Sequence, residues 1–280
     1  MLTIKAALAK APLLEAVGDT PRLDTELLLM HVLGVDKAYL YTWPERELNF
    51  DQEQQFERLL EQRQSGIPVA YLIGSREFWS LPLAVNEGTL IPRPETELLV
   101  QLVLQLFAPE PGRVVADLGT GTGAIALAIA TERPGWRLIA SDRIAQAVAL
   151  AEQNRQHLAL QNVTCVLSDW CQNLPHLEYD LIISNPPYID PQDPHLTLGD
   201  VRFEPRSALI ADEKGLGDIK RIAAQAKELL RRDGYLLLEH GWNQAGQVRE
   251  ILVHEGYTEI DSYRDLAGCE RATQGRWPGI

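Results

Sequence analysis

The sequence has few of the features found in secreted, membrane-bound or metal-binding proteins. Its 280 residues include only three cysteines, Cys165, Cys171 and Cys269, whose odd number argues against a disulfide framework and whose spacing fits no metal site. No apolar run approaches the roughly 20 residues of a membrane-spanning helix. We interpret the briefly apolar N-terminus as an amphipathic helix rather than a signal peptide. We therefore expect a cytoplasmic protein with no membrane partner and no metal.

Positive charge is also scarce. The chain has 26 Lys and Arg against 39 Asp and Glu, a formal net charge of −13, and shows no basic cluster. Proteins that bind duplex nucleic acid usually carry a clustered basic surface, because neutralising phosphates supplies much of their affinity. The acidity therefore argues against direct binding of nucleic acid and suits a protein partner with a basic surface.

The hydrophobic pattern predicts two domains joined by a hairpin. Residues 1–75 have apolar residues at helical spacing, which predicts a small helical bundle with Asp24 and Glu26 on its solvent-facing sides. Its expected role is to grip a protein partner. Apolar and polar residues alternate enough over residues 76–91 to predict a β-hairpin linker. Strands and helices alternate over residues 92–280, which predicts an α/β fold with a doubly wound, Rossmann-like sheet and ligands at the carboxyl ends of its strands.

A glycine-rich turn near the start of that domain predicts a nucleotide-like ligand. Residues 113–118 read as a buried strand and residues 124–130 as a small, apolar helix. Between them lies a turn formed by Gly119, Thr120, Gly121, Thr122 and Gly123. Glycines in such a turn let a ligand approach the backbone closely. Asp142 follows the next strand, about twenty residues beyond the turn, where an acid can bind ribose hydroxyls.

The chemistry around this turn favours a ligand without phosphates. Asp117, at the end of the first strand, would repel a pyrophosphate but attract an amino group or a sulfonium. S-adenosylmethionine has both of these groups. At the end of a third strand, Asp169 is placed to accept a hydrogen bond from the adenine amine while Trp170 covers the ring. The sequence thus predicts S-adenosylmethionine as cofactor.

A second motif, Asn185-Pro186-Pro187-Tyr188, follows the apolar strand 181–184. Proline has no backbone N–H, so this turn offers carbonyl oxygens but few donors. The Asn185 side chain adds an acceptor and Tyr188 adds a flat aromatic face. Such a pocket suits a planar group with an NH2, either a carboxamide or the exocyclic amine of a nucleobase.

These residues predict a mechanism for methylating an amide. An amide nitrogen is a poor nucleophile because its lone pair is delocalised into the carbonyl. We expect the Asn185 side-chain carbonyl and the Pro186 backbone carbonyl to accept the two amide protons, with Tyr188 packed on the amide plane. This would hold the nitrogen in line with the methyl group. Asn185 would also contact the cofactor, and Pro187 the substrate.

Taken together, the motifs resemble those of a known family. The segments 117–123 and 185–188 look like a class I methyltransferase acting on a planar nitrogen. Residues 91–97, Ile-Pro-Arg-Pro-Glu-Thr-Glu, look like the hallmark of the peptide chain release factor glutamine N5-methyltransferases of the HemK/PrmC type, and we expect them at the rim of the active site. Residues 199–205 and 238–241 also match that pattern. The resemblance covers essentially the whole chain.

The resemblance implies an S-adenosylmethionine-dependent enzyme that methylates the glutamine of the Gly-Gly-Gln loop in bacterial class 1 release factors. Release factors 1 and 2 are its implied partners, and a monomer is expected. A sister enzyme that methylates a glutamine of a ribosomal protein shares the Asn-Pro-Pro-Tyr turn. A nucleic acid adenine-N6 methyltransferase is an alternative of another class, since adenine N6 is also a planar amine. A cofactor-binding module without catalysis is the third alternative.

Overall fold

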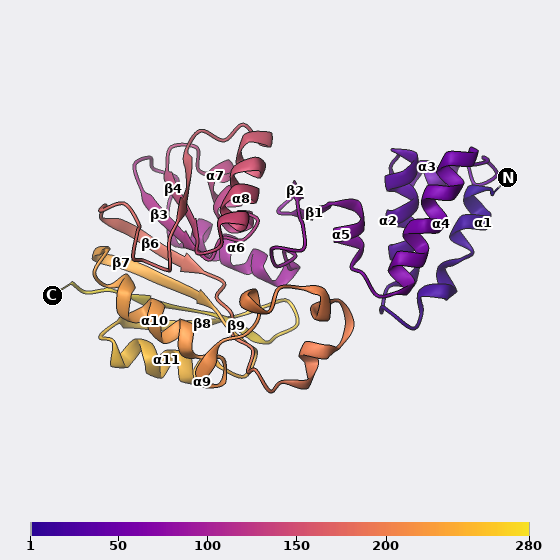
Figure 1. Ribbon diagram of the computed structural model, residues 1–280. Helices are drawn as coiled ribbons and strands as arrows, with labels where there is room; N and C mark the ends of the chain where they lie inside the picture. Colours follow the sequence, from indigo (N-terminus) through magenta and orange to yellow (C-terminus); the bar gives the residue numbers. More distant parts are fainter. Residues whose placement is uncertain (1, 280) are drawn as a thin grey trace. The chain divides into compact units, whose positions relative to one another are not determined.

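The computed structural model describes residues 2–279, which divide into two compact units (Figure 1). The first unit contains the residues up to 75 together with 194–204. The second contains residues 76–193 and those from 205 onward. The chain thus leaves the second unit and re-enters it, and the excursion begins shortly after the Asn185–Tyr188 turn.

The first unit is helical. Its elements are α1 (Ile4–Leu8), η1 (Ala11–Leu14), α2 (Pro21–Leu33), α3 (Lys37–Thr42), α4 (Phe50–Gln64), α5 (Val69–Ile73), η3 (Pro194–Thr197) and η4 (Gly199–Phe203). Local sequence sets two of the helix starts. Pro21 occupies the first position of α2, where its missing N–H leaves no helical bond unmade. Asn49 and Gln52 form a reciprocal capping box before α4.

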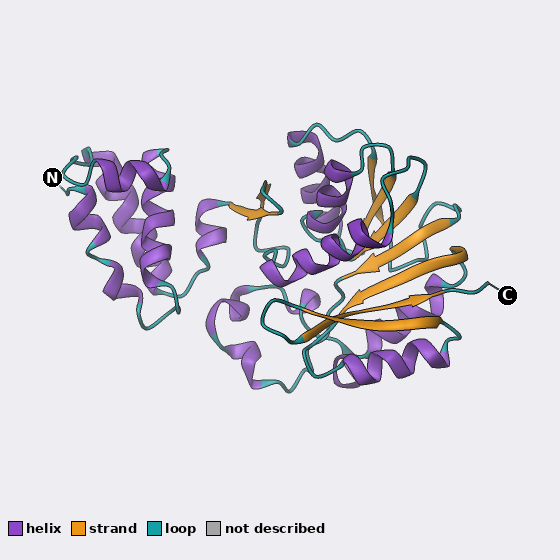
Figure 2. Ribbon diagram, turned by 180° about the vertical axis from the view of Figure 1, so that it is seen from behind, coloured by secondary structure: helices purple, strands orange, loops and turns teal. Residues whose placement is uncertain are grey.

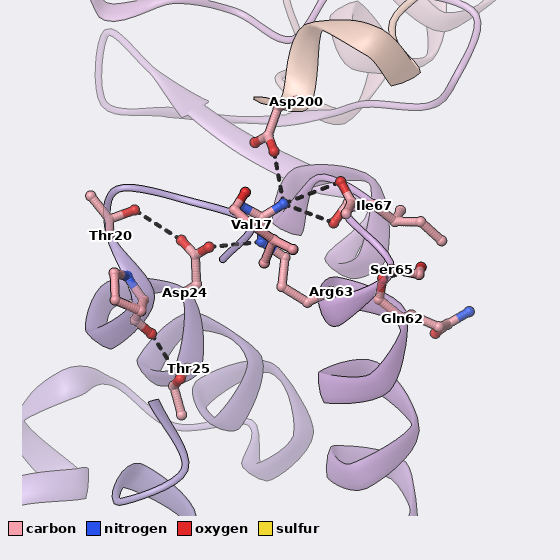
Figure 3. Close-up of polar contacts among 11 residues, drawn as sticks. Val17, Thr20, Asp24, Thr25, Gln62, Arg63, Ser65, Ile67 and Asp200 are labelled. Atoms are coloured by element: carbon pink, nitrogen blue, oxygen red, sulfur yellow. Dashed lines mark hydrogen bonds and ion pairs between the residues drawn. The ribbon is translucent and has the colours of Figure 1, made fainter. Parts of the chain in front are cut away.

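A buried arginine joins four parts of the first unit (Figure 3). Arg63, at the end of α4, is 3% exposed. Its Nε donates to Asp24 on α2 at 2.8 Å, and its Nη1 donates to Asp200 on η4 at 2.7 Å. The same guanidinium donates to the carbonyls of Gly66, Ile67 and Val17. One side chain therefore links α2, the turn after α4, the loop before α2 and the segment 194–204.

The expectation that Asp24 and Glu26 face solvent is wrong. Asp24 is 6% exposed and Glu26 is 2% exposed. Asp24 pairs with Arg63. Glu26 accepts hydrogen bonds from Arg22 and Tyr41 and forms an ion pair with Lys37. The helical pattern could not reveal this, because Arg63 and Lys37 come from other helices and, together with Arg22 on α2 itself, make burial of the acids tolerable.

The excursion 194–204 packs closely on the turn that follows α4. The Arg202 guanidinium donates to the Ser65 carbonyl at 3.4 Å and lies over the Phe203 ring. A Cβ at Gly66 would lie 1.9 Å from Arg202 Nη2 and 3.0 Å from Phe203. Only a glycine fits at position 66, where φ is also +99°.

We predict that Arg63→Met destabilises the first unit by about 3–5 kcal/mol, because it leaves the Asp24 carboxylate buried without its cation. Amide hydrogen exchange of α2 and α4 in the full chain measures this local stability. Arg58→Met, on the exposed side of α4, is the matched control and should change exchange by no more than about 0.5 kcal/mol. Equal effects of the two substitutions would show that the buried cluster adds no stability.

The second unit is built on a seven-stranded sheet. Its strands are β3 (Val114–Leu118), β4 (Arg137–Asp142), β5 (Val163–Leu167), β6 (Tyr179–Ser184), β7 (Leu230–Glu239), β8 (Thr258–Arg264) and β9 (Glu270–Arg276). Their order in the sheet is β5-β4-β3-β6-β7-β9-β8. The first five strands in this order are parallel, and β9 is antiparallel to both β7 and β8.

Helices cover both faces of this sheet (Figure 2). The unit contains η2 (Pro94–Thr96), α6 (Glu97–Leu106), α7 (Ala124–Glu132), α8 (Ala145–His157), η5 (Arg206–Ala208), α9 (Asp212–Gly215), α10 (Gly217–Ala226) and α11 (Ala245–His254). Alternate residues of each central strand enter different cores. In β3, Val115 packs in the core that includes α6 and α7, and Ala116 packs in the core that includes α10 and α11. The expected doubly wound α/β fold is confirmed.

The strand order has a topological switch point between β3 and β6. From β3 the chain proceeds outward to β4 and β5, and then returns to place β6 on the other side of β3. Loops that follow adjacent strands therefore diverge at this point and leave a crevice, which is where ligands bind in such sheets. The glycine turn follows β3 and the Asn185–Tyr188 turn follows β6, so both lie at this crevice.

A hairpin precedes the sheet, but it spans residues 75–84 and is shorter than the expected range of 76–91. It consists of β1 (Ser75–Phe78) and β2 (Leu81–Ala84). Trp79 and Ser80, between the strands, have φ of 52° and 59°, as a two-residue type I′ turn requires. Glu97 at the start of α6 accepts a hydrogen bond from the Trp79 N–H at 2.8 Å. The last acid of the 91–97 motif thus holds this turn.

Candidate active site

One cavity in the second unit lies at the carboxyl ends of β3, β4, β5 and β6. It is open to solvent and lies where sheets of this kind bind their ligands. It is lined by residues of six segments: Gly88, Thr89, Leu90, Pro92, Arg93, Thr96, Gly119, Thr120, Gly121, Thr122, Ala124, Ile125, Asp142, Arg143, Ile144, Ala147, Ser168, Trp170, Asn185, Pro187, Ser207 and Ala208. The two motifs singled out in the sequence therefore share one cavity.

The glycine turn exposes its backbone to this cavity. Gly121 has φ +56° and no atom within 4 Å of the position that a Cβ would occupy, so a ligand can approach the main chain there. Gly119 has φ +68°, and a Cβ there would lie 3.3 Å from the Trp170 ring. Trp170 therefore packs on the turn itself, and its ring belongs both to the cavity wall and to the core beneath it.

Asp142 holds the turn from the end of β4. Its Oδ2 accepts from the Gly121 N–H at 3.0 Å, and its Oδ1 accepts from the Ile144 N–H at 2.9 Å. Burial raises the pKa of this carboxyl, although these two hydrogen bonds oppose the shift. A carboxylate can accept about four hydrogen bonds, so Asp142 keeps the capacity to bind ligand hydroxyls.

Asp117 supports the turn from below and does not line the cavity. It is 1% exposed, and its Oδ2 accepts from the Thr120 hydroxyl at 2.6 Å and from the Ala126 N–H at 3.2 Å. Burial raises its pKa to about 7, and the nearby Asp142 charge adds to the shift, although both hydrogen bonds oppose it. This acid organises the turn and the start of α7.

Asn185 lies directly after β6, and its side-chain amide is anchored on one side. Its Nδ2 donates to the Thr96 hydroxyl oxygen at 3.1 Å. Since the two arms of an amide point apart, this bond turns the Oδ1 carbonyl away from Thr96. Thr96 belongs to the 91–97 motif, and Pro92, Arg93 and Thr96 all line the cavity.

Tyr188 is held at both its backbone and its hydroxyl. Gln244 Nε2 donates to the Tyr188 carbonyl at 3.0 Å, and a Cβ on Gly215 would lie 2.1 Å from that oxygen. The Tyr188 hydroxyl lies 3.4 Å from Glu239 Oε1. Burial and the neighbouring Glu239 charge raise the pKa of Tyr188, so it is protonated at neutral pH and acts as the donor.

Glu239 ends β7 and was not predicted as a site residue. It is 3% exposed, and burial raises its pKa to about 7, although contacts with Thr96, Arg271 and Tyr188 oppose the shift. Within residues 2–279, its Oε2 has no hydrogen-bond partner. The signal that could have identified it is an acid at the carboxyl end of an otherwise apolar strand, in the segment 238–241 that resembles the family pattern.

Most, but not all, of the predicted binding residues border the cavity. Of those expected to bind cofactor, Gly119, Thr120, Gly121, Thr122, Asp142, Trp170 and Asn185 line it. Gly123 and Asp169 are not among the lining residues. Gly123 is the N-cap of α7, and a Cβ there would lie 2.9 Å from Leu127. Of the substrate turn, Asn185 and Pro187 line the cavity, whereas Pro186 and Tyr188 are not among the lining residues.

Other lining residues carry no sequence signal. Thr89, Arg143, Ile144, Ser207 and Ala208 lie in loops without a motif, and only the tertiary structure brings them to this cavity. Ser207 and Ala208 come from η5, where the chain re-enters the second unit.

The pKa of Asp117 predicts a pH-dependent effect of Asp117→Asn. The folded chain holds this proton more tightly than the unfolded chain does, so ionisation of Asp117 destabilises the wild type as pH rises from about 4 to 7. The Asp117→Asn variant has no carboxyl at this position and therefore lacks this pH-dependent loss of stability. Its stability relative to wild type should therefore rise by roughly 2–3 kcal/mol between pH 5 and pH 8. Urea unfolding at both pH values measures the change, and a constant difference would contradict the assignment.

Comparisons with known proteins identify the family. The family model described as the PrmC N-terminal domain matches residues 7–74, and the model of the methyltransferase small domain matches residues 95–204. A release factor glutamine methyltransferase of Shewanella oneidensis is 49% identical over 95% of this chain and 93% of its own length. One from Salmonella typhimurium is 51% identical over 93% of this chain and 94% of its own length. The chain belongs to the release factor glutamine methyltransferase family.

A solved structure supports the fold of this family member. A methyltransferase from Pyrococcus furiosus aligns with 80% of this chain and 98% of its own, with a TM-score of 0.54 and 15% identity. At this identity the likeness concerns the fold alone. Among residues 2–279, no helix has the length and apolar character to cross a membrane.

Proposed function

We propose that this chain transfers a methyl group from S-adenosylmethionine to the N5 side-chain amide of the glutamine in the Gly-Gly-Gln loop of bacterial class 1 release factors. The observation that carries the proposal is the position of Asn185, which lines the same cavity as the glycine turn. An acceptor for amide protons thus borders the predicted donor site. Membership of the release factor glutamine methyltransferase family supports the substrate.

The residues around the glycine turn fit S-adenosylmethionine. The open backbone at Gly121, the carboxylate of Asp142 and the aromatic face of Trp170 match an amino acid moiety, a ribose and an adenine ring. Asp169, although not a lining residue, has a buried Oδ1 without a hydrogen-bond partner among the described residues, so it keeps an acceptor for the adenine amine. When bound, this cofactor supplies a methyl group already activated on a sulfonium.

The Asn185–Tyr188 turn would bind the substrate amide. The Asn185 side-chain carbonyl and the Pro186 backbone carbonyl accept its two protons and orient the nitrogen. Pro187 lines the wall of the cavity, and Tyr188 packs beside the amide plane. Positioning of this kind can supply roughly 7–11 kcal/mol of the barrier. No strong general base is required, because the nitrogen becomes acidic once it is methylated and then loses its proton.

The first unit would provide the grip on the protein substrate. Residues 7–74 match a domain model named for this family, and the chain's net charge of −13 suits a basic partner. We propose that release factors 1 and 2 are both substrates, that the enzyme acts as a monomer in the cytoplasm, where translation terminates, and that it binds no nucleic acid directly.

A methyl-transfer assay tests the substrate. Isotope-labelled S-adenosylmethionine is offered to purified release factor, to the same factor with its loop glutamine replaced, to ribosomal proteins and to DNA. We expect label only on the intact release factor, and in a peptide that contains the loop glutamine. Label on a ribosomal protein or on DNA, and none on the release factor, would overturn the proposal.

Asn185→Ala tests the catalytic role of the turn. We expect kcat to fall by roughly a hundredfold or more, as when one preorganised hydrogen-bonding group is removed from an active site. The Kd for S-adenosylmethionine, measured by calorimetry, should change much less. Asn243→Ala, at an exposed position away from the cavity, is the matched control and should keep wild-type kcat. Equal losses in kcat and cofactor affinity would contradict this role.

A further inference from the structure

The proposed mechanism needs a carbonyl, and not an NH2, to face the substrate amide at Asn185. An asparagine side chain can present either group, because a half-turn about its last bond exchanges them. If the Asn185 NH2 faced the substrate, its protons would point at the protons of the substrate amide, and no hydrogen bond could form between them. Some feature of the protein must therefore select one of the two orientations.

Thr96 is placed to make this selection. Its hydroxyl oxygen accepts from Asn185 Nδ2 at 3.1 Å, and it lies near enough to Glu239 to lower the pKa of that carboxyl, although no hydrogen bond joins these two described side chains. A hydroxyl has a single proton to donate, and an ionised carboxylate can only accept. Glu239 is therefore the acceptor that we expect for the Thr96 proton, which leaves the lone pairs of the Thr96 oxygen for Asn185.

We propose that Thr96 and Glu239 are positioning residues that fix the orientation of the Asn185 amide, so that its carbonyl faces the substrate. The order of donors is Asn185 NH2 to Thr96 and Thr96 hydroxyl to Glu239. This inference rests on the proposed function, because it assigns Asn185 the role of acceptor.

Glu239 is suited to be the last acceptor in this series of hydrogen bonds from Asn185 through Thr96, which we call the relay. Its carboxylate is 3% exposed, so water does not compete for it, and its Oε2 has no hydrogen-bond partner among residues 2–279. On its other oxygen it faces the Tyr188 hydroxyl at 3.4 Å. The same acid thus lies beside the Tyr188 hydroxyl and near Thr96, the residue that anchors Asn185.

The other charged and titratable groups around Glu239 are few. Arg271, on β9, favours its ionised form, whereas Glu95, in the 91–97 motif, opposes it. Tyr188 stays protonated near neutral pH because burial raises its pKa. Arg271 is itself paired with Asp265 at 2.9 Å. Protonation of Glu239 would give this carboxyl a proton of its own to donate to Thr96, so the orientation of the Asn185 amide would no longer be selected.

Two substitutions at Thr96 test the relay in the full chain with intact release factor as substrate. Thr96→Val keeps the shape but removes the hydroxyl, and we expect kcat to fall about tenfold or more, with the Kd for S-adenosylmethionine changed less than threefold. Thr96→Ser restores the hydroxyl and should recover most of kcat. Thr131→Val, which removes a hydroxyl bonded to the Leu127 carbonyl on α7, is the matched control and should keep wild-type kcat.

A pH series tests Glu239 and does not depend on activity alone. In wild type, kcat should fall as pH drops through about 7, the pKa to which burial raises Glu239, and this decline should be absent in Glu239→Gln. In 1H–15N spectra of the wild type, the Asn185 side-chain NH2 signals, assigned by their loss in Asn185→Ala, should shift with the same midpoint. Glu239→Gln should abolish this shift.

The outcomes separate the two proposals. If Asn185→Ala loses activity but Thr96→Val keeps kcat within threefold of wild type, or if Thr96→Ser fails like Thr96→Val, the relay is wrong and the function stands. If Asn185 NH2 signals do not titrate with Glu239, the relay is wrong whatever the substrate. If the NH2 signals titrate as expected but release factor is not methylated, the relay stands and the proposed function fails.

Discussion

The carboxyl ends of two adjacent parallel strands, β3 and β6, constrain the site more than any other feature. Because the chain moves outward from β3 to β5 before it places β6, the loops after these two strands part and leave a crevice. The glycine turn forms one wall of that crevice and the Asn185–Tyr188 turn forms the other. Residues of both turns therefore line one cavity.

Buried charged groups hold the loops around this crevice. Asp117 ties the glycine turn to α7, and Glu239 lies 3.4 Å from the Tyr188 hydroxyl. Both acids are buried, and burial raises the pKa of each to about 7. Burying an acid in this way is unfavourable. The hydrogen bonds of these acids fix the geometry of the loops. A site that works by positioning its substrate requires such a fixed geometry.

A buried charged group also holds the segment 194–204, where the chain leaves the second unit and belongs to the first. Ile189 and Ile210 pair as a short parallel bridge that closes its base in the second unit, while residues 194–204 pack within the first. Arg63 holds Asp200 there, and Arg202 covers Gly66. The segment that follows the substrate turn thus shares a buried ion-pair cluster with the helical unit. The 199–205 motif, which had no assigned chemistry in the sequence, has this structural role.

The sequence by itself determined the fold class, the hairpin and the two motifs of the cavity, because glycine, proline and strand periodicity act locally and leave a readable pattern. It also placed Asp142 and Trp170 at strand ends. Only the tertiary structure decided that Asp24 and Glu26 are buried, because Arg63 and Lys37, which pair with them, lie on other helices. Tertiary structure likewise brought Thr96 and Glu239 to Asn185 from distant positions in the chain. Contacts between distant segments depend on how the sheet is wound, and no local pattern encodes them.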